Sequence, residues 1–220
     1  MTIEFIMAEF YSKNKVNVDN ILAYFPEAKI RIYKEDNTPF IFDTRHPRAG
    51  WRMNDYQKFA GILESKADIA IAIDADMEMV SSKVRTIIPL VQKFGFCIPA
   101  SSRRLVSHDT LIGADSDKVL DETLGTGHTM CTAFIAADPK DVCVRKCFFE
   151  AREMMKENPL RGPLVLWRAI WKTGIYPYIL PQQWCVCEDD LGIGNEIILH
   201  VGHEKVWKHY NRPSPLVAAG

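Results

Sequence analysis

The sequence has almost no net charge, no long apolar run and no recognisable leader. Its 27 basic and 28 acidic residues give a formal net charge of −1, so its overall charge does not favour nucleic acid or an acidic membrane surface as a partner. No segment approaches the roughly 20 apolar residues that a membrane-spanning helix needs. Met1 to Ala8 lack a basic stretch before a long apolar segment, which predicts a first strand rather than a signal peptide. These absences predict a soluble, cytoplasmic protein without a membrane span.

The six cysteines include no C-x-x-C pair, and most stand among apolar neighbours. Buried free thiols are therefore the expectation. A zinc site built on Cys143 and Cys147, or on Cys185 and Cys187, is the alternative. Neither pair is matched by a second pair at zinc-knuckle spacing, which disfavours it.

Length and composition favour one folded unit. A chain of 220 residues that is 47% hydrophobic suits a single α/β domain, and we expect it to span residues 1–210, with 211–220 as a tail. The opening pattern predicts a strand over 3–8, a helix over 18–25 and a strand over 29–33. Later patterns predict helices over 54–65, 82–94, 139–156 and 164–171, and strands over 95–100, 131–136 and 175–180. Asp138 is the expected N-cap of the third of these helices.

The central stretch is the apolar run Ile69 to Ile73, which is followed by Asp74, Ala75 and Asp76. A short apolar run of this kind predicts a buried strand in a mostly parallel sheet. Open α/β sheets bind ligands at the carboxyl ends of their strands, where the two aspartates then lie. Two carboxylates one residue apart can share a divalent cation that also holds phosphate oxygens. A nucleoside-diphosphate site is the leading hypothesis. The alternative is a solvated turn, which is what an Asp-x-Asp pattern usually forms.

Several further residues are candidates for binding a nucleotide, each with an ordinary structural role as the alternative. Tyr11 and Asp36 lie at the ends of the first two expected strands, where a base can stack and form hydrogen bonds. Arg45, Arg48 and Arg52 precede or open a helix, a position suited to phosphate.

The later part of the chain adds candidates of the same kind. Gly127 lets backbone approach a ligand, and the adjacent His128 can donate to a sugar hydroxyl or a phosphate. The acidic turn Glu188, Asp189 and Asp190 is either solvated or contains a catalytic carboxylate. The segment 101–124 has weak periodicity and is expected to form a loop region over the site.

A late apolar strand ends in His200-Val201-Gly202-His203-Glu204-Lys205-Val206-Trp207. His200 is a candidate for a third metal ligand, and Lys205 is a candidate for a cation that binds phosphate. Together with Asp74-Ala75-Asp76, this segment resembles the nucleotide-diphosphate-sugar transferases of the GT-A fold, and most closely the glycogenin-like group. That family combines an Asp-x-Asp after a central strand with a late His-x-x-Gly-x-x-Lys-Pro-Trp. Here the late segment is one residue shorter between histidine and lysine, and Val206 replaces the proline.

The resemblance implies a GT-A-like three-layer α/β fold, with a mostly parallel central sheet flanked by helices. It implies that Asp74, Asp76 and His200 bind Mn²⁺ or Mg²⁺ and that Lys205 contacts the diphosphate of a nucleoside-diphosphate sugar. The function it implies is metal-dependent sugar transfer, with retention slightly favoured because of the late histidine segment. An inverting enzyme would need a base, for which Glu188, Asp189 or Asp190 is available.

Three other functions compete with this one. A haloacid-dehalogenase-like phosphatase places its Asp-x-Asp after the first strand, whereas Asp74 lies a third of the way along the chain. A sugar-nucleotide pyrophosphorylase needs a glycine-rich basic loop where this chain has Glu9-Phe10-Tyr11-Ser12. A non-catalytic sugar-nucleotide or carbohydrate-binding protein of the same fold stays open. So does the acceptor, which is a glycan, a protein, a small molecule or a modified nucleic-acid base.

Overall fold

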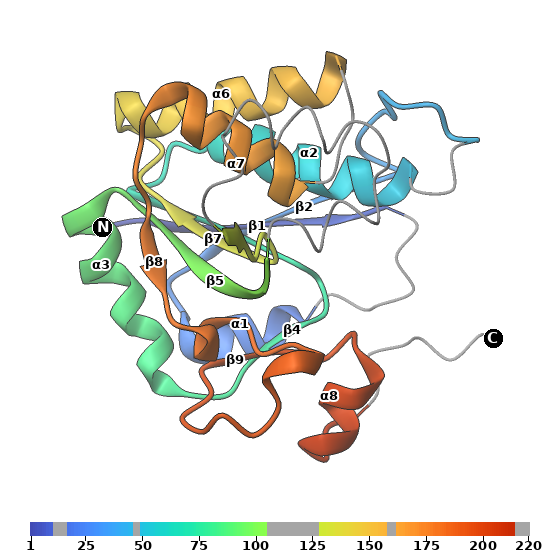
Figure 1. Cartoon of the computed structure of the whole chain (residues 1–220), viewed down its shortest axis with the longest axis vertical. Coiled ribbons are helices and arrows are strands. Elements are labelled where there is room, and N and C mark those ends of the chain that lie inside the picture. The colour runs from blue at the N-terminus through green and yellow to red at the C-terminus, as the bar shows by residue number, and fades with distance from the viewer. Residues whose placement is uncertain (11–16, 46–48, 105–127, 158–161, 214–220) are drawn as a thin grey trace.

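The computed structural model describes residues 1–10, 17–45, 49–104, 128–157 and 162–213, and within these the chain forms a layered α/β fold (Figure 1). Its main sheet has seven strands in the order β2-β1-β3-β7-β5-β6, with β8 paired to β5. The strands are β1 (Ile3–Glu9), β2 (Lys29–Lys34), β3 (Ile69–Ile73), β5 (Phe96–Arg104), β6 (His128–Met130), β7 (Phe134–Ala137) and β8 (Tyr178–Leu180). Strands β6 and β7 run opposite to the rest. The expected α/β fold with a mostly parallel sheet is confirmed.

Strand β3 lies in the interior of the sheet, between β1 and β7. All five of its residues are buried, and successive side chains of a strand point to opposite faces. Ala70 and Ala72 accordingly belong to one hydrophobic core, and Ile69, Ile71 and Ile73 belong to the other. A continuous apolar run is therefore required here, because both faces of the sheet are covered.

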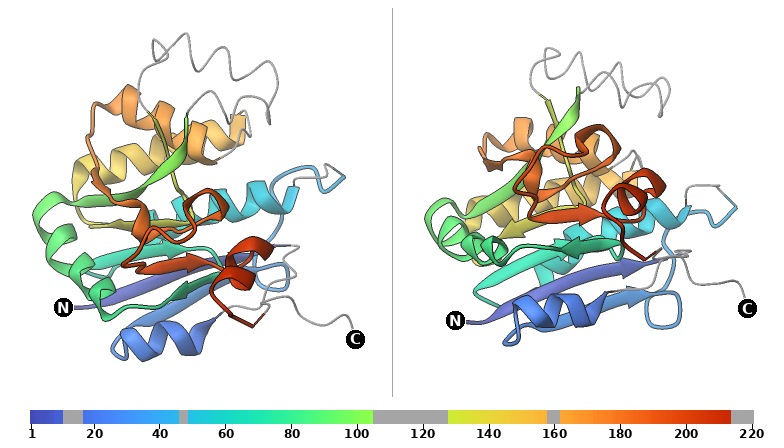
Figure 2. Two further views of the ribbon diagram at one scale, coloured as in Figure 1. Left: turned by 60° about the horizontal axis from the view of Figure 1, so that its bottom comes forward. Right: turned by 90° about the horizontal axis from the view of Figure 1, so that it is seen from below.

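Helices cover both faces of the sheet and complete the three layers (Figures 1 and 2). On one face lie α2 (Ala49–Glu64), α6 (Val142–Glu157) and α7 (Gly162–Thr173), where the rings of Phe59 and Phe148 pack with centroids 6.0 Å apart. On the other lie α1 (Val18–Tyr24), the 3₁₀ turn η1 (Ser82–Thr86) and α3 (Ile87–Phe94). No helix in the described ranges is both long and apolar enough to cross a membrane.

A small second sheet lies on the α1 and α3 side. Strand β4 (Met77–Met79) pairs antiparallel with β9 (Ile198–His200), and Met77 is opposite His200. The short turns η2 (Gln182–Trp184) and η3 (Glu188–Asp190) precede β9, and helix α8 (Glu204–His209) follows it. This ribbon joins the chain just past β3 to the late segment, although about 120 residues separate them.

Some expected boundaries are wrong. Helix α2 begins at Ala49 rather than at residue 54, which places Arg52 on the helix and not in the preceding loop. Helix α6 begins at Val142, and Asp141 caps it by accepting from the N–H groups of Cys143 and Val144, at 2.8 and 3.0 Å. The expected cap, Asp138, instead accepts from the Lys140 N–H at 2.8 Å within a turn.

Three other elements differ from the expected ranges. The strand expected over 131–136 is β7, which starts only at Phe134, because residues 131–133 form a turn. The helix expected over 82–94 is split into η1 and α3. Strand β8 starts at Tyr178 rather than at residue 175, after Gly174 with φ of 68°.

Candidate functional site

The candidate site begins where β3 ends. Asp74 is the first residue past the strand, and its N–H donates to the carbonyl of Ala133 in the turn before β7, at 2.9 Å. Its Oδ1 accepts from Nζ of Lys58 on α2, at 2.7 Å. Sheet, turn and helix thus hold Asp74 together at the carboxyl end of the central strand.

The ribbon of β4 and β9 brings His200 to Asp76. Because Met77 pairs with His200, the residue before Met77 lies beside the same histidine, and His200 Nε2 is 3.2 Å from Asp76 Oδ1. Burial opposes charge on both groups, but their mutual attraction outweighs it. The pKa of Asp76 is lowered and that of His200 is raised.

The three predicted metal ligands lie together. One oxygen of Asp74, one oxygen of Asp76 and one ring nitrogen of His200 all lie within 4.8 Å of one another. Carboxylate oxygens suit Mn²⁺ and Mg²⁺, and imidazole is accepted by transition metals such as manganese. The donor set therefore fits a divalent cation.

Gly202 shapes the same site. A Cβ atom built on it would lie 1.8 Å from Oδ2 of Asp76, closer than any non-bonded contact. Only a glycine leaves room for the Asp76 carboxylate next to His200. This explains in physical terms why the late segment has a glycine shortly after its histidine.

Lys58 neutralises the carboxylates behind the site. Its side chain is almost fully buried, and Nζ contacts Asp74 Oδ1 at 2.7 Å, Asp55 Oδ1 at 3.1 Å and the Thr132 carbonyl at 3.0 Å. Burial alone would lower the pKa of Lys58, but the two carboxylates outweigh it and raise the pKa. Asp55 also accepts from the first N–H of α7, at Gly162, at 2.9 Å. The network thus ties α2, α7 and the 131–133 turn to the end of β3.

Two residues of the late segment face the acidic turn. His203 Nδ1 lies 3.6 Å from Glu188 Oε1, and Lys205 Nζ lies 3.7 Å from Glu188 Oε2. The ring of His203 meets that of His200 edge to face, with centroids 4.5 Å apart. His203 therefore lies between Glu188 and His200. Asp189 is exposed, and Asp190 is buried in the turn.

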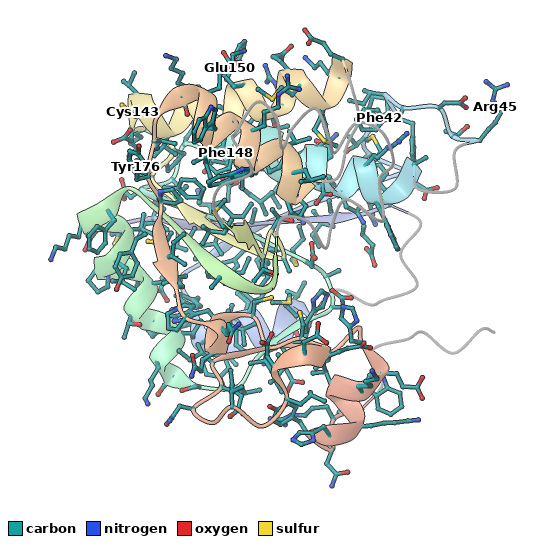
Figure 3. All side chains as sticks on the ribbon, in the orientation of Figure 1. Phe42, Arg45, Cys143, Phe148, Glu150 and Tyr176 are labelled. Carbon is teal, nitrogen blue, oxygen red and sulfur yellow. The ribbon has the colours of Figure 1, made fainter. Side chains whose placement is uncertain are left out.

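The predicted donor-binding residues of the N-terminal half are more scattered. Asp36 follows β2 and pairs with Lys34 at 3.2 Å. Arg45 is 89% exposed, binds Asp43 at 2.8 Å and lies at the outer end of the segment between β2 and α2 (Figure 3). Arg52 lies on the first turns of α2 and is partly buried. Asp36 and Arg45 thus each form an ion pair with a neighbour two residues away in the sequence, and the donor-binding roles of all three residues stay predictions.

Several predicted residues lie outside the described part of the chain. These are Tyr11, Arg48 and Gly127, together with most of the expected loop over 101–124. His128 is the first residue of β6, and its backbone pairs with Arg104. Their roles at the site stay predictions.

Sequence reasoning missed Lys58 and Asp55, and it missed the contact between Cys187 and His200. Lys58 stands between Gln57 and the apolar pair Phe59-Ala60, and its spacing of three residues from Asp55 was the available signal. Cys187 Sγ lies 3.3 Å from Nδ1 of His200. No local sequence pattern predicts the contact between Cys187 and His200, because it depends on the β-bridge between Val186 and Leu199 of β9.

Comparison with protein-family models and with curated sequences found no match. Comparison with solved structures found glycosyltransferases. The galactosyltransferase LgtC, solved with donor and acceptor sugar analogues, has a TM-score of 0.58 at 10% identity, over 96% of this chain and 93% of its own. A glycosyltransferase involved in glycosylation of the PBCV-1 major capsid has a TM-score of 0.58 at 8% identity, over 96% and 98%. Mouse xyloside xylosyltransferase 1 has a TM-score of 0.50 at 9% identity, over 90% and 96%.

These similarities extend over nearly the whole of each chain. At such low identity they establish the arrangement of strands and helices and not the chemistry. The fold of this chain is the GT-A-like fold of these glycosyltransferases.

Proposed function

We propose that the protein is a metal-dependent glycosyltransferase, which moves a sugar from a nucleoside-diphosphate sugar to an acceptor. The observation that carries the proposal is the group of Asp74, Asp76 and His200, whose donor atoms lie within 4.8 Å of one another. The group lies at the carboxyl end of the central strand, where α/β sheets bind ligands. The glycogenin-like pattern of the two motifs supports the same assignment.

In this proposal Asp74, Asp76 and His200 hold Mn²⁺ or Mg²⁺. When bound, the cation neutralises negative charge that develops on the departing nucleoside diphosphate. Lys58 fixes the position of Asp74, and Gly202 gives the Asp76 carboxylate its space. Lys205, whose side chain is 70% exposed, supplies a mobile ammonium group for the diphosphate.

We further propose that transfer retains the anomeric configuration, as the late histidine segment suggests. A retaining enzyme needs no carboxylate base on the acceptor hydroxyl. In the inverting alternative the base is Glu188, Asp189 or Asp190. Of these we favour Glu188, which lies 3.6 Å from His203 and 3.7 Å from Lys205. Analysis of the product anomer by NMR distinguishes the two outcomes.

The first experiment is a thermal-shift screen with nucleoside diphosphates and their sugars, with and without Mn²⁺. A ligand that binds only the folded protein raises the melting temperature by mass action. We expect one nucleotide to give a metal-dependent shift in the wild type that Asp76→Asn loses. Asp19→Asn, an exposed position in the first turn of α1, is the matched control and should keep the shift. No shift with any nucleotide would contradict the proposal.

Binding and transfer are then separated by assaying the nucleotide found in the screen. Release of nucleoside diphosphate from its sugar, in the presence of Mn²⁺ and candidate acceptors, is expected for the transferase. A donor that binds with metal but is never cleaved or transferred would instead identify a sugar-nucleotide-binding protein of the same fold.

A further inference from the structure

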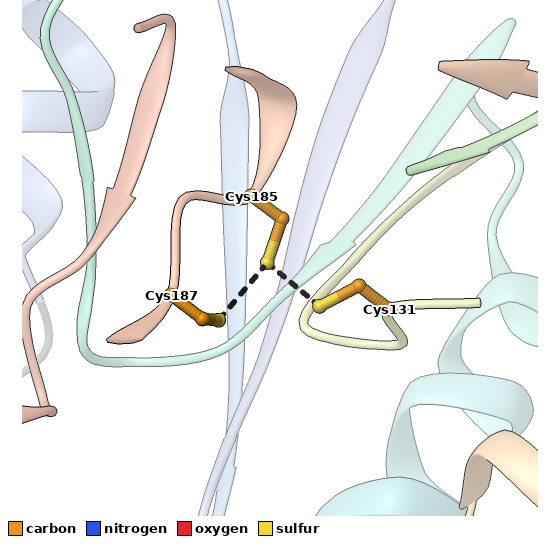
Figure 4. A group of neighbouring side chains, drawn as sticks. All are labelled: Cys131, Cys185 and Cys187. Carbon is orange, nitrogen blue, oxygen red and sulfur yellow. Dashed lines mark hydrogen bonds between the residues drawn. The ribbon is translucent and has the colours of Figure 1, made fainter. Parts of the chain in front are cut away.

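Behind the proposed donor site, three cysteines from two distant parts of the chain meet (Figure 4). Sγ of Cys185 lies 2.6 Å from Sγ of Cys131 and 3.8 Å from Sγ of Cys187. All three sulfur atoms lie within 4.8 Å of one another. Cys185 is buried, and Cys131 and Cys187 are of intermediate exposure.

The backbone holds the cysteines in place from both sides. The Cys131 N–H donates to the Pro99 carbonyl of β5 at 3.0 Å. Cys185 and Cys187 flank Val186, which bonds β9 through its N–H to Ile198 at 3.0 Å and through its carbonyl to the His200 N–H at 3.0 Å. The convergence of the thiols follows from the fold and not from a flexible side chain alone.

From this convergence we propose that Cys131, Cys185 and Cys187 form a binding site for a thiophilic divalent metal ion, zinc in the first instance. Thiolates are preferred ligands of zinc, at about 2.3 Å in a tetrahedral arrangement. That geometry puts neighbouring sulfur atoms about 3.8 Å apart, which is the separation of Cys185 and Cys187. Cys131 has to move about 1 Å away from Cys185 to reach the same spacing.

The donor atoms around the group support a metal, because three sulfur atoms and a ring nitrogen meet here. His200 Nδ1, 3.3 Å from Cys187 Sγ, is a nitrogen donor within reach of the fourth tetrahedral position. Zinc replaces the protons of the thiols when it binds.

A metal ion at this site would stabilise the segments that hold the proposed donor site. The turn that begins at Cys131 provides the Thr132 carbonyl to Lys58 and the Ala133 carbonyl to the Asp74 N–H. Cys187 contacts His200 from the other side. A metal ion held by the three sulfurs therefore links both segments that position the Asp74, Asp76 and His200 side chains.

The test is an anaerobic titration of the reduced, metal-free protein with Co²⁺, read by absorption. Cobalt bound to thiolates gives sulfur-to-metal charge-transfer bands, whereas cobalt on carboxylates and imidazole does not. We expect one equivalent of Co²⁺ to produce these bands and added Zn²⁺ to remove them. Asp76→Asn should keep the bands, which separates this site from the proposed donor site and from any failure of the proposed function.

Cysteine variants complete the test. The two test variants are Cys131→Ser and Cys187→Ser, at the two cysteines of the group that are not fully buried. Both should lose the tightly bound equivalent of Co²⁺, while circular dichroism shows that they are folded. Cys143→Ser, at an exposed cysteine on the first turn of α6 (Figure 3), is the control and should bind cobalt as the wild type does. Absence of thiolate bands in the reduced wild type would overturn the proposal, as would bands that persist in both cluster variants. A Cys131–Cys185 disulfide without bound metal, found by mass spectrometry after alkylation in fresh lysate, would also overturn it.

Discussion

Removal of the buried ammonium group behind the site is the most direct test of how the structure holds Asp74. In Lys58→Met the side chain keeps its apolar length and loses Nζ. Three acceptors then lose their donor, namely Asp74 Oδ1, Asp55 Oδ1 and the Thr132 carbonyl, which Nζ contacts at 2.7, 3.1 and 3.0 Å. Two carboxylates that share one cation are left close together without it.

The size of the effect follows from burial. Removal of one partner of a buried ion pair destabilises a protein by about 3–5 kcal/mol. The Asp55 and Asp74 side chains are 13% and 29% exposed, so water relieves part of the cost. We therefore expect a loss at the lower end, about 3 kcal/mol. For a chain of this length that corresponds to a fall in melting temperature of about 6–12 °C.

The assay is urea unfolding followed by circular dichroism, with thermal melting alongside it. Lys66→Met is the matched control, because Lys66 is an exposed lysine just past the end of the same helix, and surface substitutions usually change stability by less than about 0.5 kcal/mol. If Lys58→Met is no more destabilising than Lys66→Met, Lys58 does not compensate the two carboxylates and the described network is refuted.

Two further predictions concern Gly202 and Asp68. Gly202→Ala places a Cβ 1.8 Å from Asp76 Oδ2, so we expect the variant to fold but to lose the Mn²⁺-dependent thermal shift; an undiminished shift would refute the role of Gly202. The Asp68 carboxylate binds the Lys140 ammonium and the Thr2 N–H, which lower its pKa from 3.8 to about 2. A lowered folded-state pKa stabilises the protein above pH 3.8, and this contribution disappears as the pH falls through about 2. Asp68→Asn should therefore be less stable than wild type at pH 6, and the difference should shrink as the pH falls from 3.8 toward about 2. Urea unfolding measures it, and a difference independent of pH would contradict this assignment.

The sheet was predictable because the apolar pattern of a strand reflects which of its faces are buried. The run Ile69 to Ile73 is continuously apolar, and the structure buries it on both faces. The aspartates that follow therefore had to lie at the sheet edge. Their position needed no knowledge of distant contacts, since strand and turn are adjacent in the sequence.

Element boundaries were less predictable, because equivalent residues compete for the same role. Asp138 and Asp141 both precede the helix that became α6, and Pro139 suited a first helical turn after Asp138. The structure uses Pro139 and Lys140 in a turn and gives the cap to Asp141. A capping side chain contributes about 1 kcal/mol, and both aspartates offer the same contribution, so the local sequence does not distinguish them.

Contacts between distant residues were beyond sequence patterns. Cys131 and Cys185 are 54 residues apart. Their segments meet only because β7 pairs with β3 and β9 pairs with β4. Lys58 carries a charge, so its default location on a helix is the solvent side. Its burial depends on Asp55, one turn earlier, and on Asp74, beyond the next strand.

His200 joins the two proposed functions of this end of the molecule. Its Nε2 faces Asp76 at 3.2 Å and its Nδ1 faces Cys187 at 3.3 Å. In metal sites the second ring nitrogen of a histidine usually contacts a partner that fixes the orientation of the ring. Here that partner is Cys187 of the cysteine group. If both proposed sites bind metal, we expect the state of the thiols to change how Nε2 is oriented toward a cation beside Asp74 and Asp76. Because binding at linked sites is reciprocal, a cation held by His200 Nε2 would in turn affect the affinity of the cysteine group for metal.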